Sequence, residues 1–391
     1  MKGIRNFVDK IKPNFEKGGK FSFLWSVFDG FETFLFVPNT VTKSGCHIRD
    51  AIDMKRGMIT VVIALIPALL FGMYNVGYQH FLAIGEIADF WKTFFYGFLA
   101  VLPSVIISYV VGLTIEFYFA QKRRHEISEG FLVTGLLIPM ILPINVPLWM
   151  IALATAFAVF VGKEIFGGTG MNIINPALLA RAFLFFAYPL KMSGDDVWVR
   201  IGKHHQAIDG FSGATPLGEA LNDNIAAIHD TWSISDMVLG FIPGSVGETS
   251  FVAILLGAIF LLITGIVSWK IMLSIFAGGY LMGLIFNLVG ANDVMLIPAW
   301  EHFLIGGFAF GAVFMATDPV TSAQTETGKY IYGALIGILC VLMRVINPAY
   351  PEGMMLAILL MNVFAPLIDY LVVQSNIRKR VKRAKDVMVK I

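Results

Sequence analysis

The sequence predicts an all-α polytopic membrane protein with about ten transmembrane helices, arranged as two inverted five-helix repeats that contain broken helices. Three observations lead to this fold class. The 391 residues are 57% hydrophobic and 14% charged, with a mean hydropathy of +0.74, whereas soluble domains are close to half apolar and about one-quarter charged. Ten apolar segments are long enough to form helices, and short motifs recur at one fixed offset in the two halves of the chain.

The ten apolar segments divide into two sets of five. The first repeat is expected at 56–190 and contains segments at 56–73, 94–119, 131–142, 146–162 and 176–190. The second is expected at 250–373 and contains segments at 250–268, 271–290, 302–316, 330–346 and 353–373. A full crossing needs about 20 residues. Segments 131–142 and 302–316 are shorter and are interrupted by Pro or Gly, so we expect discontinuous elements that end inside the protein.

The two halves share motifs. EGFLVTG at 129–135 matches EHFLIGG at 301–307, and INPA at 174–177 matches INPA at 346–349, both at an offset of 172 residues. Because five is an odd number of helices, the two repeats must cross the membrane in opposite directions. Inverted repeats with broken helices are typical of transporter folds, and the broken elements tend to form the binding site.

The distribution of Lys and Arg orients the chain. These residues gather in the N-terminal segment 1–55, at 122–124 and in the basic tail 374–391. An even number of crossings places all three on one face, which the positive-inside rule makes cytoplasmic. The long loop 191–249 contains few basic residues and is therefore expected on the outer face.

Three polar stretches interrupt the apolar segments. They are GKEIFGGTGMNIINPA at 162–177, FMATDPVTSAQTETG at 314–328 and NPAYPEG at 347–353. Irregular backbone at membrane depth occurs only where it is buried in protein or lines a cavity. The first stretch contains Asn172 and Asn175, and the second contains Asp318. The third contains Glu352, which lies near Arg344 in the sequence. The alternative for each is a capped helix end with a satisfied polar side chain.

Acidic residues in or beside apolar segments are costly, and so they indicate function. Here they are Glu116, Glu164, Asp318 and Asp369. Small hard cations prefer carboxylate and carbonyl oxygens, which favours a Na⁺ or H⁺ path. The alternative is an interfacial carboxylate paired with Lys or Arg. Arg181, in INPALLARAF, is a candidate partner for an acid or for a ligand oxygen.

Several function classes are excluded by missing motifs. The sequence contains no dinucleotide-binding or phosphate-binding glycine motif and no CxxC. Its two cysteines, Cys46 and Cys340, are too few for a four-cysteine iron–sulfur or zinc site. We expect no nucleic-acid partner, and no binding of NADH or ATP through a familiar motif.

The stretch DGFSGATPL at 209–217 lies in the predicted outer loop and places Thr215 among small residues. It resembles the D-x-x-S/T-G-A-T motif at which some bacterial membrane proteins carry flavin mononucleotide (FMN). The whole chain resembles the NqrB/RnfD family, which supplies membrane subunits to sodium-translocating NADH:quinone oxidoreductases and to Rnf complexes. The stretches that carry this resemblance are RRHEISEGF, KEIFGGTGMNIINPALLARAFLFFAYP, DGFSGATPL, IPGSVGETS, GGFAFGAVFMATDPVT and RVINPAYPEGMMLAILLMN. The N-terminal extension and basic tail favour the NqrB branch of this family.

This resemblance implies several sites. FMN would be esterified through its phosphate to Thr215, within a motif formed by Asp209, Ser212, Gly213 and Ala214. A non-covalent riboflavin is expected at the broken elements, near Thr134, Asn172, Asn175 and Asp318. Quinone would be reduced near the cytoplasmic side, with Gly112 and Glu116 as candidate contacts. The candidates for a Na⁺ path are Glu116 and Asp369.

The resemblance also implies a function. Electrons would pass from FMN through riboflavin to quinone, coupled to outward Na⁺ movement across the bacterial inner membrane, with both termini cytoplasmic. The implied partners are a subunit with NADH, FAD and iron–sulfur sites, a second FMN-bearing subunit, small membrane subunits and a flavin transferase. Two alternatives remain: an Rnf-type subunit without quinone reduction, and a flavin-free transporter or channel in which Thr215 is unmodified.

Overall fold

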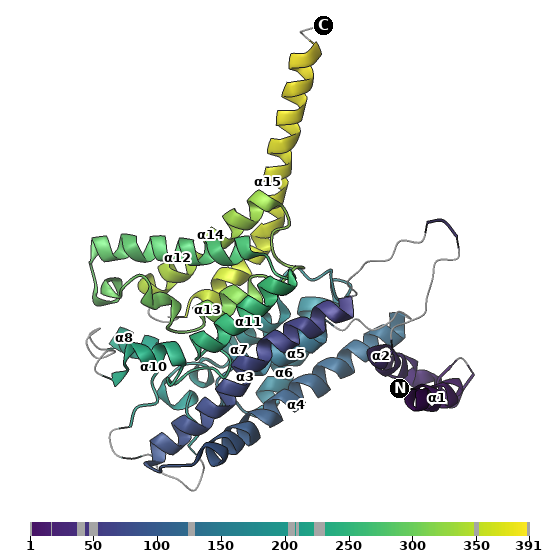
Figure 1. The fold of residues 1–391 in the computed structure, drawn as a ribbon, viewed down its shortest axis with the longest axis horizontal. Helices are drawn as coiled ribbons and strands as arrows, with labels where there is room; N and C mark the ends of the chain where they lie inside the picture. Colours follow the sequence, from purple (N-terminus) through teal and green to yellow (C-terminus); the bar gives the residue numbers. More distant parts are fainter. Residues whose placement is uncertain are drawn as a thin grey trace.

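The computed structural model describes residues 2–16, 18–36, 44–46, 54–123, 130–201, 208, 211–222, 231–347 and 352–388. Within these ranges the chain is helical and contains no β-strand (Figure 1). The fold class is therefore all-α, as the composition predicts.

The first half of the chain forms two long helices followed by shorter ones. These are α3 (Met54–Ile84), α4 (Phe90–Arg123), α5 (Phe131–Ile141), α6 (Leu148–Val159), the π-helical turn η3 (Phe160–Glu164) and α7 (Pro176–Ala187). Asn175 caps α7 by accepting hydrogen bonds from the N–H groups of Ala177 and Leu178, and Pro176 occupies the first helical position. The INPA motif at 174–177 therefore begins a helix, since Asn is a strong N-cap and Pro suits the first turn.

The segment between the halves contains short elements, namely η4 (Pro189–Lys191), η5 (Asp195–Val197), α8 (Pro216–Asn222) and α10 (Ile234–Leu239). The second half contains α11 (Phe251–Thr264), α12 (Trp269–Val289), η6 (Asp293–Leu296), η7 (Glu301–Phe303), α13 (Phe308–Phe310), the π-helical turn η8 (Gly311–Met315), α14 (Glu326–Ile346) and α15 (Met354–Met388). The predicted segments 131–142 and 302–316 are indeed short helical pieces in the structure.

Five of the described helices are long and apolar enough to cross a membrane, namely α3, α4, α12, α14 and α15. The shorter apolar helices are α5, α7 and α11. Large apolar side chains on the outer surfaces of the long helices, such as Leu70, Leu99 and Leu371, are exposed, as lipid contact requires. The chain is thus a membrane protein, while ten crossings and the inverted repeat remain predictions.

The long helices pack into a body from which α15 projects at its C-terminal end (Figure 1). Helix α3 packs against α4 and α11, α12 against α14, and α15 against α14 and α7. The core between them is fully buried and includes Ile138, Phe310 and Tyr332.

The N-terminal segment contains α1 (Lys2–Ile11), η1 (Lys12–Asn14), η2 (Ser22–Leu24) and α2 (Trp25–Leu35). The side chain of Gln121, near the end of α4, accepts hydrogen bonds from the backbone N–H and the hydroxyl of Ser26 (3.0 and 2.8 Å). This contact holds α2 against the end of α4 that follows Glu116.

Candidate functional site

Thr215 lies at a pocket in the segment between the two halves. Its half-buried side chain accepts a hydrogen bond from the N–H of Gly218 (3.1 Å) at the start of α8. Gly213 fits only without a side chain, because an added Cβ would lie 2.5 Å from the carbonyl oxygen of Asp195. Ser212 is exposed and Ala214 is buried. Asp209 of the same motif lies outside the described residues.

The pocket beside Thr215 leads to charged groups. Its cavity volume is about 100 Å³, and its lining includes Phe185, Trp198, Arg181 and Glu248. It therefore combines two aromatic walls with a guanidinium and a carboxylate.

A buried ionic cluster forms one wall of this pocket. Arg181 pairs with Glu248 (Nη1 to Oε1, 2.6 Å) and, through Nη2, with the carboxylate of Glu352. Burial raises the pKa of Glu248 to about 7; Arg181 opposes the rise and Glu352 adds to it. The expected partnership of Arg181 with an acid is therefore present, and it involves two acids.

Glu352 lies beside Arg344, as the sequence suggests, but the contact is made by its backbone. Arg344 is fully buried and donates hydrogen bonds to the carbonyl oxygens of Glu352 (3.1 Å), His302 (2.6 Å) and Ile305 (2.9 Å). An added Cβ at Gly307 would lie 2.6 Å from Glu248 Oε1. The EHFLIGG motif therefore wraps around Arg344 and leaves room for Glu248.

Asn175 and Asp318 come together from opposite halves of the chain. The amide of Asn175 donates to Asp318 Oδ2 at 3.5 Å, across 143 residues. Asp318 also accepts from the N–H of Val320 (3.0 Å) and the hydroxyl of Thr321 (3.3 Å).

The other candidate riboflavin residues are less closely connected. Asn172 is buried and donates to the carbonyl oxygen of Ile174 (3.3 Å), one residue before Asn175. Thr134 is half-buried in α5. The structure adds Asn362 of α15, whose amide oxygen accepts from the N–H of Asn175 (3.2 Å) while its nitrogen donates to the Tyr332 hydroxyl (2.7 Å). Asn362 could have been found from the sequence, because it is a polar residue inside the apolar run LLMNVFAP.

Gly112 and Glu116 lie on one buried face of α4. A Cβ at Gly112 would lie 1.9 Å from Cζ of Phe131, so α4 and α5 approach closely at Gly112. Glu116 is 4% exposed and forms a buried ion pair with Lys163 of η3. Arg123 then pairs with Glu164 (2.8 Å). Lys163 was not predicted, because a lysine at the end of an apolar segment is common at membrane interfaces.

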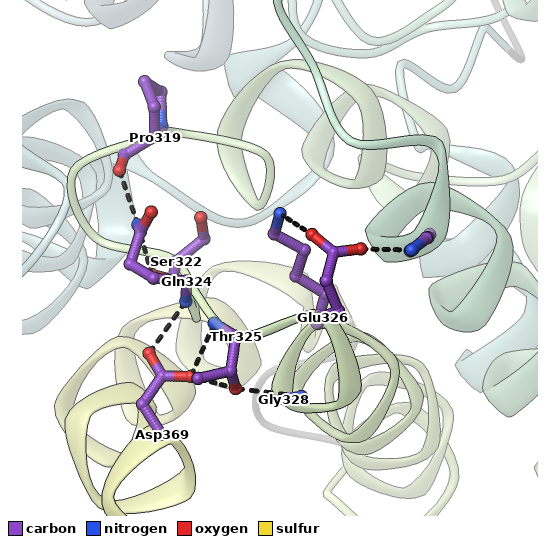
Figure 2. Close-up of polar contacts among 9 residues, drawn as sticks. Pro319, Ser322, Gln324, Thr325, Glu326, Gly328 and Asp369 are labelled. Atoms are coloured by element: carbon purple, nitrogen blue, oxygen red, sulfur yellow. Dashed lines mark hydrogen bonds and ion pairs between the residues drawn. The ribbon is translucent and has the colours of Figure 1, made fainter. Parts of the chain in front are cut away.

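Asp369 of α15 holds the start of α14 (Figure 2). Its Oδ1 accepts from the N–H and hydroxyl of Thr325 (2.9 and 2.5 Å), and its Oδ2 accepts from the N–H of Gln324 (2.7 Å). The neighbouring Glu326 is exposed and pairs with Lys270 and Lys329. Thr325 caps α14, because its hydroxyl oxygen accepts from the N–H of Gly328 (3.1 Å), and Asp369 of the neighbouring helix holds this capping residue in place.

The candidate residues thus form separate groups. Thr215 lies near the Arg181 cluster, Asn175 contacts Asp318, and Glu116 pairs with Lys163. Asp369 contacts the stretch that follows Asp318, through Gln324 and Thr325. No hydrogen bond or ion pair among the described residues joins Asp369 to Glu116, the two candidates for a Na⁺ path.

Comparison with known proteins identifies relatives over nearly the whole chain. A family model described as "NQR2, RnfD, RnfE family" matches residues 41–378. The B subunit of the Na(+)-translocating NADH-quinone reductase of Chromohalobacter salexigens is 48% identical over 404 residues, covering 97% of both chains. The proteins of the same description from Ectopseudomonas mendocina and Azotobacter vinelandii are 48% and 45% identical, each covering 97% of this chain and 99% of the relative. This chain therefore belongs to the NQR2, RnfD, RnfE family.

Proposed function

We propose that this chain is the redox-active membrane subunit of a sodium-translocating NADH:quinone oxidoreductase. The observation that carries the proposal is its similarity, at 45–48% identity over 97% of its length, to relatives described as the B subunit of that enzyme. Nearly full coverage of both chains, which includes most of the N-terminal extension, favours this function over the Rnf-type alternative.

Covalent FMN is proposed at Thr215. Its hydroxyl oxygen lies at the edge of a pocket with aromatic walls and a guanidinium, groups suited to a flavin ring and its polar edge. The cavity of about 100 Å³ is smaller than the roughly 300 Å³ of the smallest usual ligand pockets, so it would receive only part of a flavin. When bound, a flavin supplies the redox chemistry; the protein supplies position and exclusion of water.

Riboflavin is proposed at the Asn175–Asp318 contact. Asn172, Asn175 and Asp318 present amide and carboxylate groups at broken backbone, and Asn362 adds an amide from α15. These groups match the donor and acceptor edges of a flavin ring. Thr134 in α5 is retained as a further candidate. The residues present therefore fit a non-covalent flavin.

Electrons are proposed to enter from partner subunits at the outer FMN and to reach quinone near Gly112 and Glu116, while Na⁺ moves outward. A membrane core of about 30 Å separates the two faces, which favours an intermediate carrier such as riboflavin. The proposed orientation places both termini in the cytoplasm and the chain in a bacterial inner membrane. The contacts of α3 with α11 and of α7 with α15 support the inverted repeat, because each pair joins elements that correspond in the two halves.

The test is a search for flavin that survives denaturation. The protein is expressed with a flavin transferase, separated on a denaturing gel, viewed by flavin fluorescence, and mapped by peptide mass. Fluorescence should disappear in Thr215→Val and persist in Ser193→Ala, which removes another hydroxyl that lines the pocket. A non-fluorescent wild-type band with an unmodified Thr215 peptide would favour the flavin-free transporter.

A further inference from the structure

The ion pair between Glu116 and Lys163 is buried in the part of the chain predicted to lie within the membrane. Each residue is 4% exposed, and Glu116 Oε1 accepts directly from the Lys163 ammonium. Removing a carboxylate from water is costly unless a positive charge accompanies it. Lys163 therefore already provides the charge that a Na⁺ ion would bring to Glu116.

Helices α4 and α6 run in the same direction. Helix α5 begins beside α4, where the Tyr109 hydroxyl donates to the Leu132 carbonyl oxygen (2.6 Å) and Phe131 packs on Gly112. Ile144, just before α6, packs against the cluster that contains Ala100 and Val101 of α4, and Lys163, just after α6, pairs with Glu116 further along α4. Helices α4 and α6 are therefore parallel, and their facing residues keep a nearly constant difference in number.

Two buried hydroxyls follow the same register as the ion pair. Glu116 and Lys163 differ by 47 residues, and so do Ser108 and Thr155, eight residues earlier on each helix. Ser108 and Thr155 are both 0% exposed, and neither hydroxyl has a hydrogen-bond partner among the described residues. Unpaired buried hydroxyls are uncommon, because each has lost its hydrogen bonds to water without gaining a partner in the protein. They lie about 12 Å along the helices from the ion pair.

We propose that Lys163 is the tethered counterion that Na⁺ must displace to reach Glu116, and that Ser108 and Thr155 provide the next oxygen position along the α4–α6 interface. This inference rests on the proposed function. One carboxylate compensates one positive charge, so the Lys163 ammonium and the Na⁺ ion bind the Glu116 carboxylate alternately. Carboxylate and hydroxyl oxygens are the hard ligands that such an ion prefers.

The position of Lys163 suits such an exchange. It lies in the π-helical turn η3, a distortion that is frequent at functional sites. Its flexible four-carbon chain can move the ammonium without moving the helix. The adjacent Glu164 stays anchored, because Arg123 binds both its carboxylate (2.8 Å) and its backbone carbonyl oxygen (2.6 Å).

The deciding experiment uses the purified complex that contains the full chain. Equilibrium binding of ²²Na⁺, and the Na⁺ concentration that gives half-maximal quinone reduction, are compared for wild type, Lys163→Met and Lys163→Arg. Lys163→Met should lower both the dissociation constant for ²²Na⁺ and the half-maximal Na⁺ concentration at least fivefold, because no ammonium competes. In Lys163→Arg both values should stay within twofold of wild type. Lys329→Met is the matched control, since it removes a lysine paired with Glu326 elsewhere, and should change neither value. Unchanged binding in Lys163→Met would overturn the inference.

A second variant keeps the test decisive if Lys163→Met does not assemble. The double variant Glu116→Gln, Lys163→Gln leaves no buried charge at this position, so the complex should assemble but lose Na⁺ stimulation of quinone reduction. Retention of wild-type stimulation would overturn the inference. A wild-type complex without Na⁺-stimulated quinone reduction would refute the proposed function instead. In that case the ²²Na⁺ binding comparison still decides the role of Lys163.

The hydroxyl position has a separate test, in which stability and transport change in different directions. Ser108→Ala with Thr155→Val removes two unpaired hydroxyls, so thermal stability should be unchanged or higher. The rate of Na⁺ uptake into proteoliposomes should nevertheless fall at least fivefold. Wild-type uptake in this double variant would overturn the role of the two hydroxyls.

Discussion

The carboxylate of Asp369 in α15 binds Thr325, the residue that caps α14, with Oδ1 accepting both the N–H and the hydroxyl of that residue (2.9 and 2.5 Å) (Figure 2). A third hydrogen bond, from the N–H of Gln324, binds Oδ2 (2.7 Å). The first turn of a helix has N–H groups without intrahelical partners. The Thr325 hydroxyl accepts from one of them, the N–H of Gly328 (3.1 Å), and Asp369 fixes the position of Thr325. Asp369 therefore joins two predicted transmembrane helices at one end, and Oδ2 retains one acceptor position for a cation.

Asp369→Asn is expected to destabilise the protein. An asparagine has one acceptor oxygen in place of two, so its amide nitrogen would face a backbone N–H. Hydrogen bonds to charged groups contribute about 1.5–3 kcal/mol each, so we expect a loss of about 2 kcal/mol, measured as a lower thermal midpoint in detergent. Glu326→Gln is the control, because Glu326 is exposed and solvent screens its ion pairs with Lys270 and Lys329. Equal midpoints for the two variants would contradict the role of Asp369 in holding the start of α14.

Gly112 is expected to tolerate no side chain. An added Cβ would lie 1.9 Å from the ring of Phe131, which is fully buried, so Gly112→Ala must displace the ring. Overpacking of this kind costs about 1–3 kcal/mol. Gly57→Ala in α3 is the matched control, because nothing lies within 4 Å of its added Cβ and Gly→Ala in a helix is stabilising by about 0.5–1 kcal/mol. The thermal midpoints should therefore move in opposite directions, and a stable Gly112→Ala variant would contradict the close packing.

The helical character of the chain was predictable from hydropathy, but the end of its first long helix was not. Helix α3 was expected to end at residue 73 and continues to Ile84. Polar residues follow residue 73, and the structure gives them partners. Asn75 donates to the carbonyl oxygen of Ile242 (2.9 Å), and His80 Nδ1 lies 2.7 Å from the carbonyl oxygen of Arg200. Partners from the segment between the halves satisfy these side chains within the helix, and no local pattern reveals such partners.

The candidate site was predictable where polar residues interrupt apolar sequence. Asn175 and Asp318 were identified from such breaks, but their contact across 143 residues was not. Ser108 and Lys163 were missed, because a single small hydroxyl or one lysine at a helix end does not stand out in a hydropathy pattern. Their significance depends on the partners, or the absence of partners, that packing gives them.

Asn175 has two separable roles, which matched substitutions distinguish. Its oxygen caps α7, and its nitrogen contacts Asp318. Asn175→Ser keeps a capping oxygen, so stability should change by only a few tenths of a kcal/mol, whereas Asn175→Ala should lose about 1 kcal/mol. If riboflavin binds here, both variants should lose non-covalent flavin, measured after acid extraction of the purified complex. Full flavin content in Asn175→Ser would place riboflavin elsewhere.

The Arg181 cluster is expected to make stability depend on pH through Glu248. Its folded pKa of about 7 lies above the usual glutamate pKa of 4.5, chiefly because the side chain is buried. The folded protein therefore retains a proton that the unfolded chain releases between these values, and stability falls as pH rises from about 4.5 to about 7. The thermal midpoint of wild type should decline across this range relative to that of Glu248→Gln, whose amide oxygen still accepts from Arg181. Glu352→Gln removes the neighbouring negative charge, so it should lower the pKa of Glu248 and shift the decline to lower pH. Parallel curves for wild type and Glu248→Gln would show that Glu248 does not retain a proton over this range.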